Sequence, residues 1–299
     1  MFQLKTKPSQ IFTICALATS IISGCSTPPP ETPIGQIATR QFEAQNWEVA
    51  INKYTQAMAQ DGPRYSYQFN RGVCYKELGR NKDAISDFIK ADSIRPHNDG
   101  QALFQVASLY LQSGQFTQAI KFADTLLNDN SSNSKVLEIR KKALLGRVQQ
   151  SMDTGQLERA LADLDVLIKS SPDEINLKLM KAKSLFLVGK NIETRKETDD
   201  YLQKLIRTVH VNSIEWKQMT KMRAINLFHM KSAQHVRVAR KVFDTYLNSN
   251  KAAGLSSDDA FWAGLIARVC LDTAKGDEYW SKLSKSYIEK RKKELKNNK

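Results

Sequence analysis

The side chains that could do chemistry in this 299-residue chain do not form a catalytic pattern. Of its four histidines, His229 and His235 are closest, but a spacing of six places them on different faces of a helix. The two adjacent pairs of aspartates diverge for the same reason. The sequence lacks a phosphate-binding glycine loop, a metalloprotease motif and a Cys-X-X-Cys pair. We therefore expect no enzyme, no cofactor and no metal site, and keep an enzymatic site within residues 207–299 as a remote alternative.

One cysteine near the N-terminus stands in a chemically suggestive context. Lys5 and Lys7 precede an uncharged apolar run from Ile11 to Ile22, which is too short to span a bilayer but has the length of a signal-peptide core. The run ends in Ile22-Ser23-Gly24-Cys25. This arrangement resembles the lipobox of bacterial lipoproteins, although Leu is more usual where Ile22 stands. The resemblance implies a signal peptide over residues 1–24 and lipidation (acyl chains of the palmitate type) at the Cys25 thiol.

The residues after Cys25 indicate in which membrane the protein is anchored. In such lipoproteins an Asp directly after the Cys marks retention in the inner membrane, and here that position is Ser26. The resemblance therefore implies an outer-membrane lipoprotein on the periplasmic side. Residues 25–33, which are rich in proline, are expected to form an extended tether after the lipidated Cys. Cys74 and Cys270 remain as thiols, and we expect each to be buried separately.

The charge of the chain is uneven. The formal net charge is +14, and loss of the signal peptide removes two lysines. Residues 31–133 are nearly neutral, whereas residues 134–299 carry the excess of Lys and Arg. A periplasmic location excludes nucleic acid as a partner, so the charge indicates either a solvated surface or an anionic partner, such as an acidic protein, a glycan or lipid phosphates. The candidate basic patch consists of Lys217, Lys221, Arg223, Lys231, Arg237, Arg240 and Lys241.

The distribution of prolines predicts an all-α fold. Beyond the tether, the chain contains only Pro63, Pro96 and Pro172, and no segment shows the alternating pattern of a strand. Small residues recur at Ala50, Ala84, Ala119 and Ala160 and, less well, at Thr194, in steps close to 34 residues. One period contains a characteristic set: Gly72, Tyr75, Gly79, Ala84, Phe88, Ala91 and Pro96.

This set and its period resemble the tetratricopeptide repeat (TPR), a pair of antiparallel helices. The resemblance implies a solenoid of about five helical hairpins over residues 34–206, with an inter-helix turn at Gln45, Gly79, Gly114, Gly155 and Gly189. One step is longer than the others, which predicts extra residues around Ser134–Arg140 that either lengthen the first helix of that repeat or add a loop.

Residues 207–299 are expected to form divergent helices. We predict a pair at Ser213–Met230 and Ala233–Leu247, and a further helix with its N-cap at Ser257. A last helix should carry Tyr279, Trp280, Leu283 and Tyr287 and fray within Glu289–Lys299.

The TPR resemblance also implies a partner-binding groove, because the first helix of each repeat lines the concave face of such arrays. Asn70 matches the variant that clamps a carboxylate tail, but Gln101 and Gln105 stand where that variant needs Lys and Arg, so a chaperone tail is not the expected partner. The expected partner is instead a peptide segment of another protein. The candidate groove residues are Phe69, Val73, Lys76, Phe104, Ser108, Leu111, Leu145, Gln149, Leu179, Lys183 and Phe186.

Two functions follow from these resemblances. The first is a protein-protein interaction scaffold for an envelope machine, similar to the TPR lipoproteins that support assembly of type IV or tight-adherence pili and of secretins. The second is an adaptor that recruits peptidoglycan hydrolases or proteases, similar to NlpI-type lipoproteins. The sequence does not decide between them.

Overall fold

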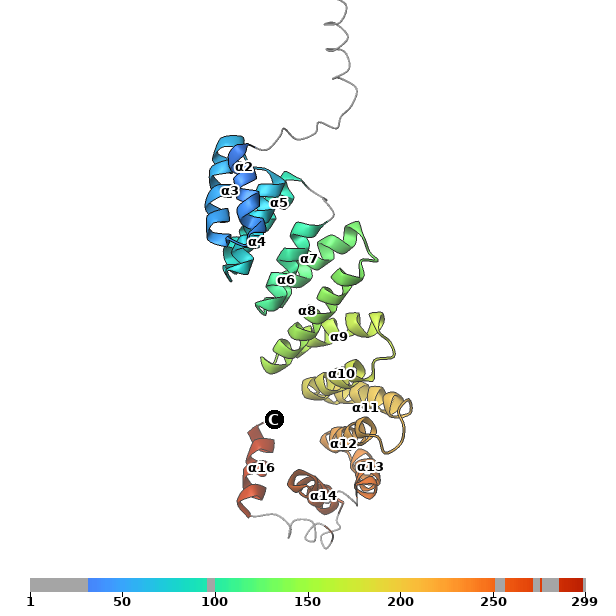
Figure 1. Ribbon diagram of the computed structural model, residues 1–299. Coiled ribbons are helices and arrows are strands. Elements are labelled where there is room, and N and C mark those ends of the chain that lie inside the picture. Colours follow the sequence, from blue (N-terminus) through green and yellow to red (C-terminus); the bar gives the residue numbers. More distant parts are fainter. Residues whose placement is uncertain (1–31, 96–99, 251–255, 271–274, 276–284, 298–299) are drawn as a thin grey trace, which may run out of the picture. The chain divides into compact units, whose positions relative to one another are not determined.

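The computed structural model describes residues 32–95, 100–250, 256–270, 275 and 285–297. Within these residues the chain forms fourteen helices and no strand, so the predicted all-α class is confirmed. The chain divides into two compact units, Met1–Val106 and Ala107–Lys299. In Figure 1 the helices of each unit follow one another in chain order.

The first unit consists of α2 (Pro33–Glu43), α3 (Trp47–Asp61), α4 (Tyr65–Glu77), α5 (Asn81–Ile94) and the first half of α6 (Gln101–Gln112). Helix α2 packs on α3, α3 on α4, and α4 on α5. Small residues permit this close packing: the core combines Ala38, Ala50 and Ala57 with the fully buried rings of Tyr54 and Tyr67.

The second unit begins with the other half of α6 and contains α7 (Phe116–Asp129), α8 (Ser134–Asp153), α9 (Leu157–Ser170), α10 (Ile175–Val188), α11 (Ile192–Ile206), α12 (Ile214–His229), α13 (Ala233–Ser249), α14 (Ser257–Val269) and α16 (Lys285–Asn297). From α7 to α14, each helix packs against the next. The C-terminal helix α16 packs Tyr287, Ile288 and Leu295 against a core cluster that includes Phe261 and Trp262.

The turns between paired helices follow the predicted register. Gln45, Gly79, Gly114 and Gly155 all have positive φ, between 59° and 73°. This left-handed conformation ends the first helix and is strained for residues with a side chain, which explains the glycines. Gly189 departs from the pattern, with φ −56°, and α11 instead starts from Asn191, whose side chain accepts a hydrogen bond from the Thr194 amide. The local geometry therefore changes within the last predicted repeat, where Thr194 also fits the small-residue position less well.

The long repeat step has the expected consequence. Helix α8 has 20 residues and begins at Ser134, whereas the first helices α4 and α10 have 13 and 14. The extra residues therefore lengthen the helix, one of the two outcomes that the sequence allowed. Helices α12 and α13 confirm the predicted pair after residue 207 within one or two residues at each end.

Three predicted boundaries need correction. Pro33 is the first residue of α2, with Thr32 as its N-cap, so the tether ends earlier than expected. Ser256 caps α14 in place of Ser257, because its hydroxyl accepts from the Asp259 amide. The C-terminal residues expected to fray are helical as far as Asn297. Cys25, Pro96, Tyr279, Trp280 and Leu283 lie outside the described residues. No described helix is both long enough and apolar enough to cross a bilayer.

Candidate partner-binding surface

The candidate groove residues all lie on the first helix of a pair. They are distributed over α4, α6, α8 and α10 as the register requires. Most are partly buried, while the side chains of Gln149 and Lys183 are exposed. In the second unit, these helices therefore present a mixed surface, in which apolar side chains are half covered by neighbours and the side chains of Gln149 and Lys183 reach solvent. Such a surface suits an extended or helical peptide.

In the first unit, the surface is formed around α4. The ring of Phe69 stacks on Tyr65 at 5.5 Å and lies 5.3 Å from Phe88, so intramolecular packing holds part of this side chain. Lys76 Nζ donates to Gln105 Oε1 at 3.4 Å, which links α4 to the start of α6. These contacts fix the orientation of two candidate side chains.

In the second unit, Leu111 and Leu145 pack against one core cluster and keep part of their surface accessible. Leu179 is different: it is only 7% exposed and packs with Ala182, Leu202 and Met219. The expectation that Leu179 contributes to the groove is wrong. The physical reason is that both α11 and α12 pack on α10, so a position exposed by the repeat register is covered here.

Ion pairs between helices hold the hairpins in register, and the sequence analysis did not identify them. Arg71 Nε donates to Asp87 at 2.6 Å, and Arg147 donates twice to Asp163 at 2.7 Å. Both pairs join the two helices of a hairpin, both span 16 residues, and both aspartates are buried. The Arg and Asp spacing was visible in the sequence and is the signal that could have identified them.

The structure divides the predicted basic patch. Lys221 pairs with Asp258 and Asp259, Arg223 with Asp199, and Arg240 with Asp244. Burial opposes the charge of Lys221, but the hydrogen bonds that Lys221 donates to the two aspartates outweigh it and raise the pKa of Lys221. The side chains of Lys231, Arg237 and Lys241 are exposed, and Lys217 is partly buried without an ion pair among the described residues. Fewer than seven of the predicted basic side chains are therefore available to an anion.

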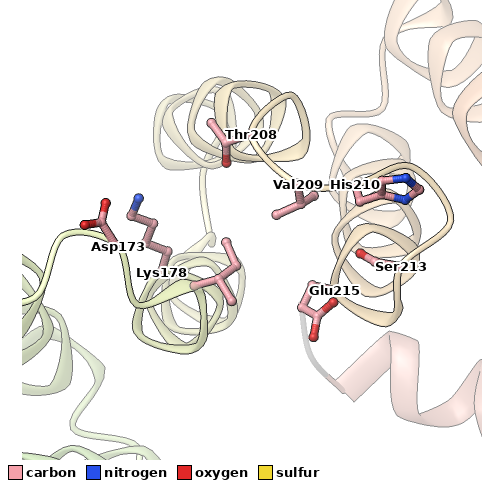
Figure 2. Close-up of a pocket in the computed structure, with 8 residues that line it drawn as sticks. Asp173, Lys178, Thr208, Val209, His210, Ser213 and Glu215 are labelled. Atoms are coloured by element: carbon pink, nitrogen blue, oxygen red, sulfur yellow. The ribbon is translucent and has the colours of Figure 1, made fainter.

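One open pocket of about 390 Å³ is lined by none of the candidate groove residues. Figure 2 shows Asp173 and Lys178 facing Thr208, Val209 and the start of α12 across it. Its lining combines acidic, basic and hydroxyl groups, so it does not indicate one class of ligand. Among the described residues, no group of His, Cys, Asp and Glu could hold a metal ion.

The two described cysteines are free thiols. Cys74 is buried in the first unit, and burial raises its pKa to about 12. Cys270 is partly buried in the second unit, with its Sγ 3.8 Å from the Val236 carbonyl oxygen. A thiol with the pKa of Cys74 is a poor nucleophile at neutral pH, which agrees with a packing role for this residue.

Comparisons with known proteins agree with a helical-repeat chain. Residues 36–99 match the family described as Tetratricopeptide repeat. A co-chaperone of Fusarium oxysporum f. sp. lycopersici, "Tetratricopeptide repeat and J domain-containing co-chaperone DNJ1", is 25% identical over 165 residues. The match covers 54% of this chain but only 31% of the co-chaperone.

Solved structures with similar helices include the C-terminal part of a TPR repeat-containing protein from Cytophaga hutchinsonii. It is 14% identical with a TM-score of 0.46, over 83% of this chain and 93% of that one. The protein pilF from Pseudomonas aeruginosa is 15% identical with a TM-score of 0.41, over 77% of this chain and 97% of that one. The activities that these names describe belong to those proteins.

Proposed function

We propose that this chain, which carries tetratricopeptide repeats, is a lipid-anchored scaffold that binds protein partners on the first helices of its hairpins. The observation that carries the proposal is that the helices bury one set of side chains in the core and leave another set exposed. Alanines and buried rings form the core between helices, while Gln149 and Lys183 on α8 and α10 remain exposed beside half-buried apolar side chains. A repeat that buries its core against its neighbours leaves such a face available to a partner.

The proposed place of action is the periplasmic side of the outer membrane, and the proposed partners are components of an envelope machine such as a pilus or a secretin. The support for this location is the sequence around Cys25, with its apolar run, its small residues and Ser26 at the following position. Several acyl chains, each contributing about 0.8 kcal/mol per buried CH2 group, give a stable anchor.

We expect that Cys25→Ser releases the protein from the membrane. Without the thiol there is no acylation site, so fractionation of a two-membrane bacterium should find the variant outside the outer-membrane fraction. Ser26→Asp serves as the matched variant, because it keeps the acylated Cys25 and should move the protein to the inner membrane. Recovery of the Cys25→Ser protein in the outer membrane would refute the proposed anchor.

The partner surface can be tested by site-specific photo-crosslinking in intact cells. A photoreactive residue at the exposed positions Gln149 and Lys183 should give adducts with envelope proteins. The same residue at Lys169 and Lys204, which are exposed on the second helices α9 and α11, should give few or none. Equal adducts from both pairs of positions would show that the first helices are not the binding surface. The identity of the adduct separates a pilus or secretin component from a cell-wall hydrolase.

A further inference from the structure

Arg195 differs from the other arginines that are partly buried in the described part of the chain. Each of the others makes an ion pair with Asp, as the pairs of Arg71, Arg147 and Arg223 illustrate. Arg195 makes none within the described residues. Among the described residues, its side chain donates to a neutral amide, from Nη1 to Asn226 Oδ1 at 3.2 Å. A guanidinium that is partly removed from water without a carboxylate is unfavourable, and burial lowers the pKa of Arg195.

The surrounding structure holds this side chain in one place. Asn226 is fully buried and donates from Nδ2 to the Arg195 carbonyl oxygen at 2.7 Å, so α12 fixes both ends of the residue. On the other side, the Arg195 side chain lies over Gly189. A Cβ at that position would be 3.3 Å from Arg195 Cγ and 3.5 Å from Nη1. Arg195 Nε and Nη2 make no hydrogen bond with described residues, so a positioned donor pair remains available.

One ionisable group, His229, lies close enough to Arg195 for their charges to interact. His229 and Lys231 lie at the end of α12, and the positive charges of Arg195 and Lys231 both act on His229. The ring of His229 lies 5.7 Å from Trp262. Phe186 packs against the cluster that contains Trp262, and its carbonyl oxygen lies beside Gly189. None of the described carboxylates is paired with these cations: Glu193, Glu197 and Asp199 lie within four residues of Arg195 on α11, and of these Asp199 pairs with Arg223.

We infer that Arg195 is an anchor for a carboxylate presented by an acidic peptide segment of a partner protein. The guanidinium can form two parallel hydrogen bonds with a carboxylate, a geometry that a planar fork of donors favours. Exposed apolar side chains on the adjoining connection favour a peptide over a free phosphate: Leu187 is 53% exposed and Ile192 is 47% exposed, at the two ends of the α10–α11 connection. The expected segment thus has Glu or Asp beside a large apolar residue. This inference rests on the proposed scaffold role and adds the chemistry of its partner.

Replacing Arg195 is expected to have opposite effects on the stability of the fold and on the binding of an acidic peptide. Arg195→Gln gives up the hydrogen bond from Nη1 to Asn226 and removes a charge that nothing in the described part neutralises. The variant should therefore unfold at the same temperature as the original protein or at a higher one. An arginine that served only the fold would show the reverse, because its loss would break a stabilising contact.

The test uses the full chain and two capped peptides, Gly-Leu-Glu-Leu-Gly and its isostere Gly-Leu-Gln-Leu-Gly. Binding is followed by nuclear magnetic resonance on the arginine side-chain signals, with inorganic phosphate as a competing anion. We expect the Glu peptide to bind roughly tenfold to hundredfold more tightly than the Gln peptide, and Arg195→Gln to abolish the difference. Arg207→Gln is the matched control, since Arg207 is exposed at the other end of α11 and should keep the full preference.

Three results would overturn the inference: equal binding of the two peptides, a preference that survives Arg195→Gln, or tight phosphate binding without a preference for Glu. Helical circular dichroism and the unfolding temperature verify that each variant is folded. The scaffold proposal is tested separately by the crosslinking contrast between first and second helices. A failed peptide preference with a positive crosslinking contrast would refute this site and leave the scaffold role in place.

Discussion

Replacing Asp163 by Asn is expected to lower the free energy of unfolding by about 3 kcal/mol. The Asp163 carboxylate accepts two hydrogen bonds from Arg147, both at 2.7 Å, and the two side chains are only 8% and 17% exposed. The isosteric amide keeps the volume of the side chain but removes the charge that compensates the Arg147 guanidinium. The cost is therefore that of an unneutralised cation between α8 and α9. Urea unfolding followed by circular dichroism measures it.

A matched control lies on the same helix. Asp165 pairs with Lys181 of α10, but its side chain is 60% exposed. Water already solvates this carboxylate, so Asp165→Asn should cost less than about 1 kcal/mol. The double variant Arg147→Leu with Asp163→Leu should recover a large part of the loss, because no charge is then left buried. Equal losses for Asp163→Asn and Asp165→Asn would show that burial of the pair is not what matters.

The free energy of unfolding should also fall as the pH decreases from about 6.5 to about 4, because of His229. Burial lowers the pKa of His229 from 6.5 to about 4, with Arg195 and Lys231 adding to the effect. In the unfolded chain the imidazole takes up a proton below pH 6.5, whereas the folded protein resists protonation until about pH 4. The stability present above pH 6.5 is therefore lost progressively through this window, by about 3 kcal/mol.

Urea unfolding at several pH values, compared between the original protein and His229→Gln, isolates this contribution. The variant cannot take up the proton, so it should lack this part of the pH dependence. The carboxylates whose pKa is lowered, such as that of Asp259, lose their contribution below pH 3.8 and do not fall in the same window. Arg195→Gln should shift the His229 transition to higher pH, because it removes a positive charge beside the ring. An unchanged slope between pH 6.5 and pH 4 in His229→Gln would contradict the assignment.

The predictions that held are those that depend on local sequence. Gly79, Gly114 and Gly155 end the first helices because a left-handed residue closes a helix at low cost only when it has no side chain. The long α8 follows from the wide spacing between Ala119 and Ala160, since the turn residues on both sides kept their places. Errors at the start of α2 and α14 were of one residue. Pro33 was assigned to the tether although proline suits the first position of a helix, and at α14 either of two adjacent serines could serve as the cap.

The candidate surface was predicted less well, because its residues were chosen from the register alone. Register places Leu179 on a free face of α10, but α11 and α12 both cover that helix. The basic patch was likewise defined by composition. Asp199, Asp258 and Asp259, which lie on neighbouring helices, neutralise part of it through Arg223 and Lys221.

The sequence by itself determined the class of the fold, the helical pairing and the positions of the turns. These depend on helix propensity, on glycine at a left-handed position and on small residues at a fixed spacing, all of which act over one or two hairpins. The tertiary structure alone decided which charges are compensated. Arg147 forms an ion pair with a carboxylate and, within the described residues, Arg195 does not, although both are partly buried arginines in the same repeat array. That difference depends on side chains contributed by other helices, such as Asp163 of α9 and Asn226 of α12, and no local pattern specifies them.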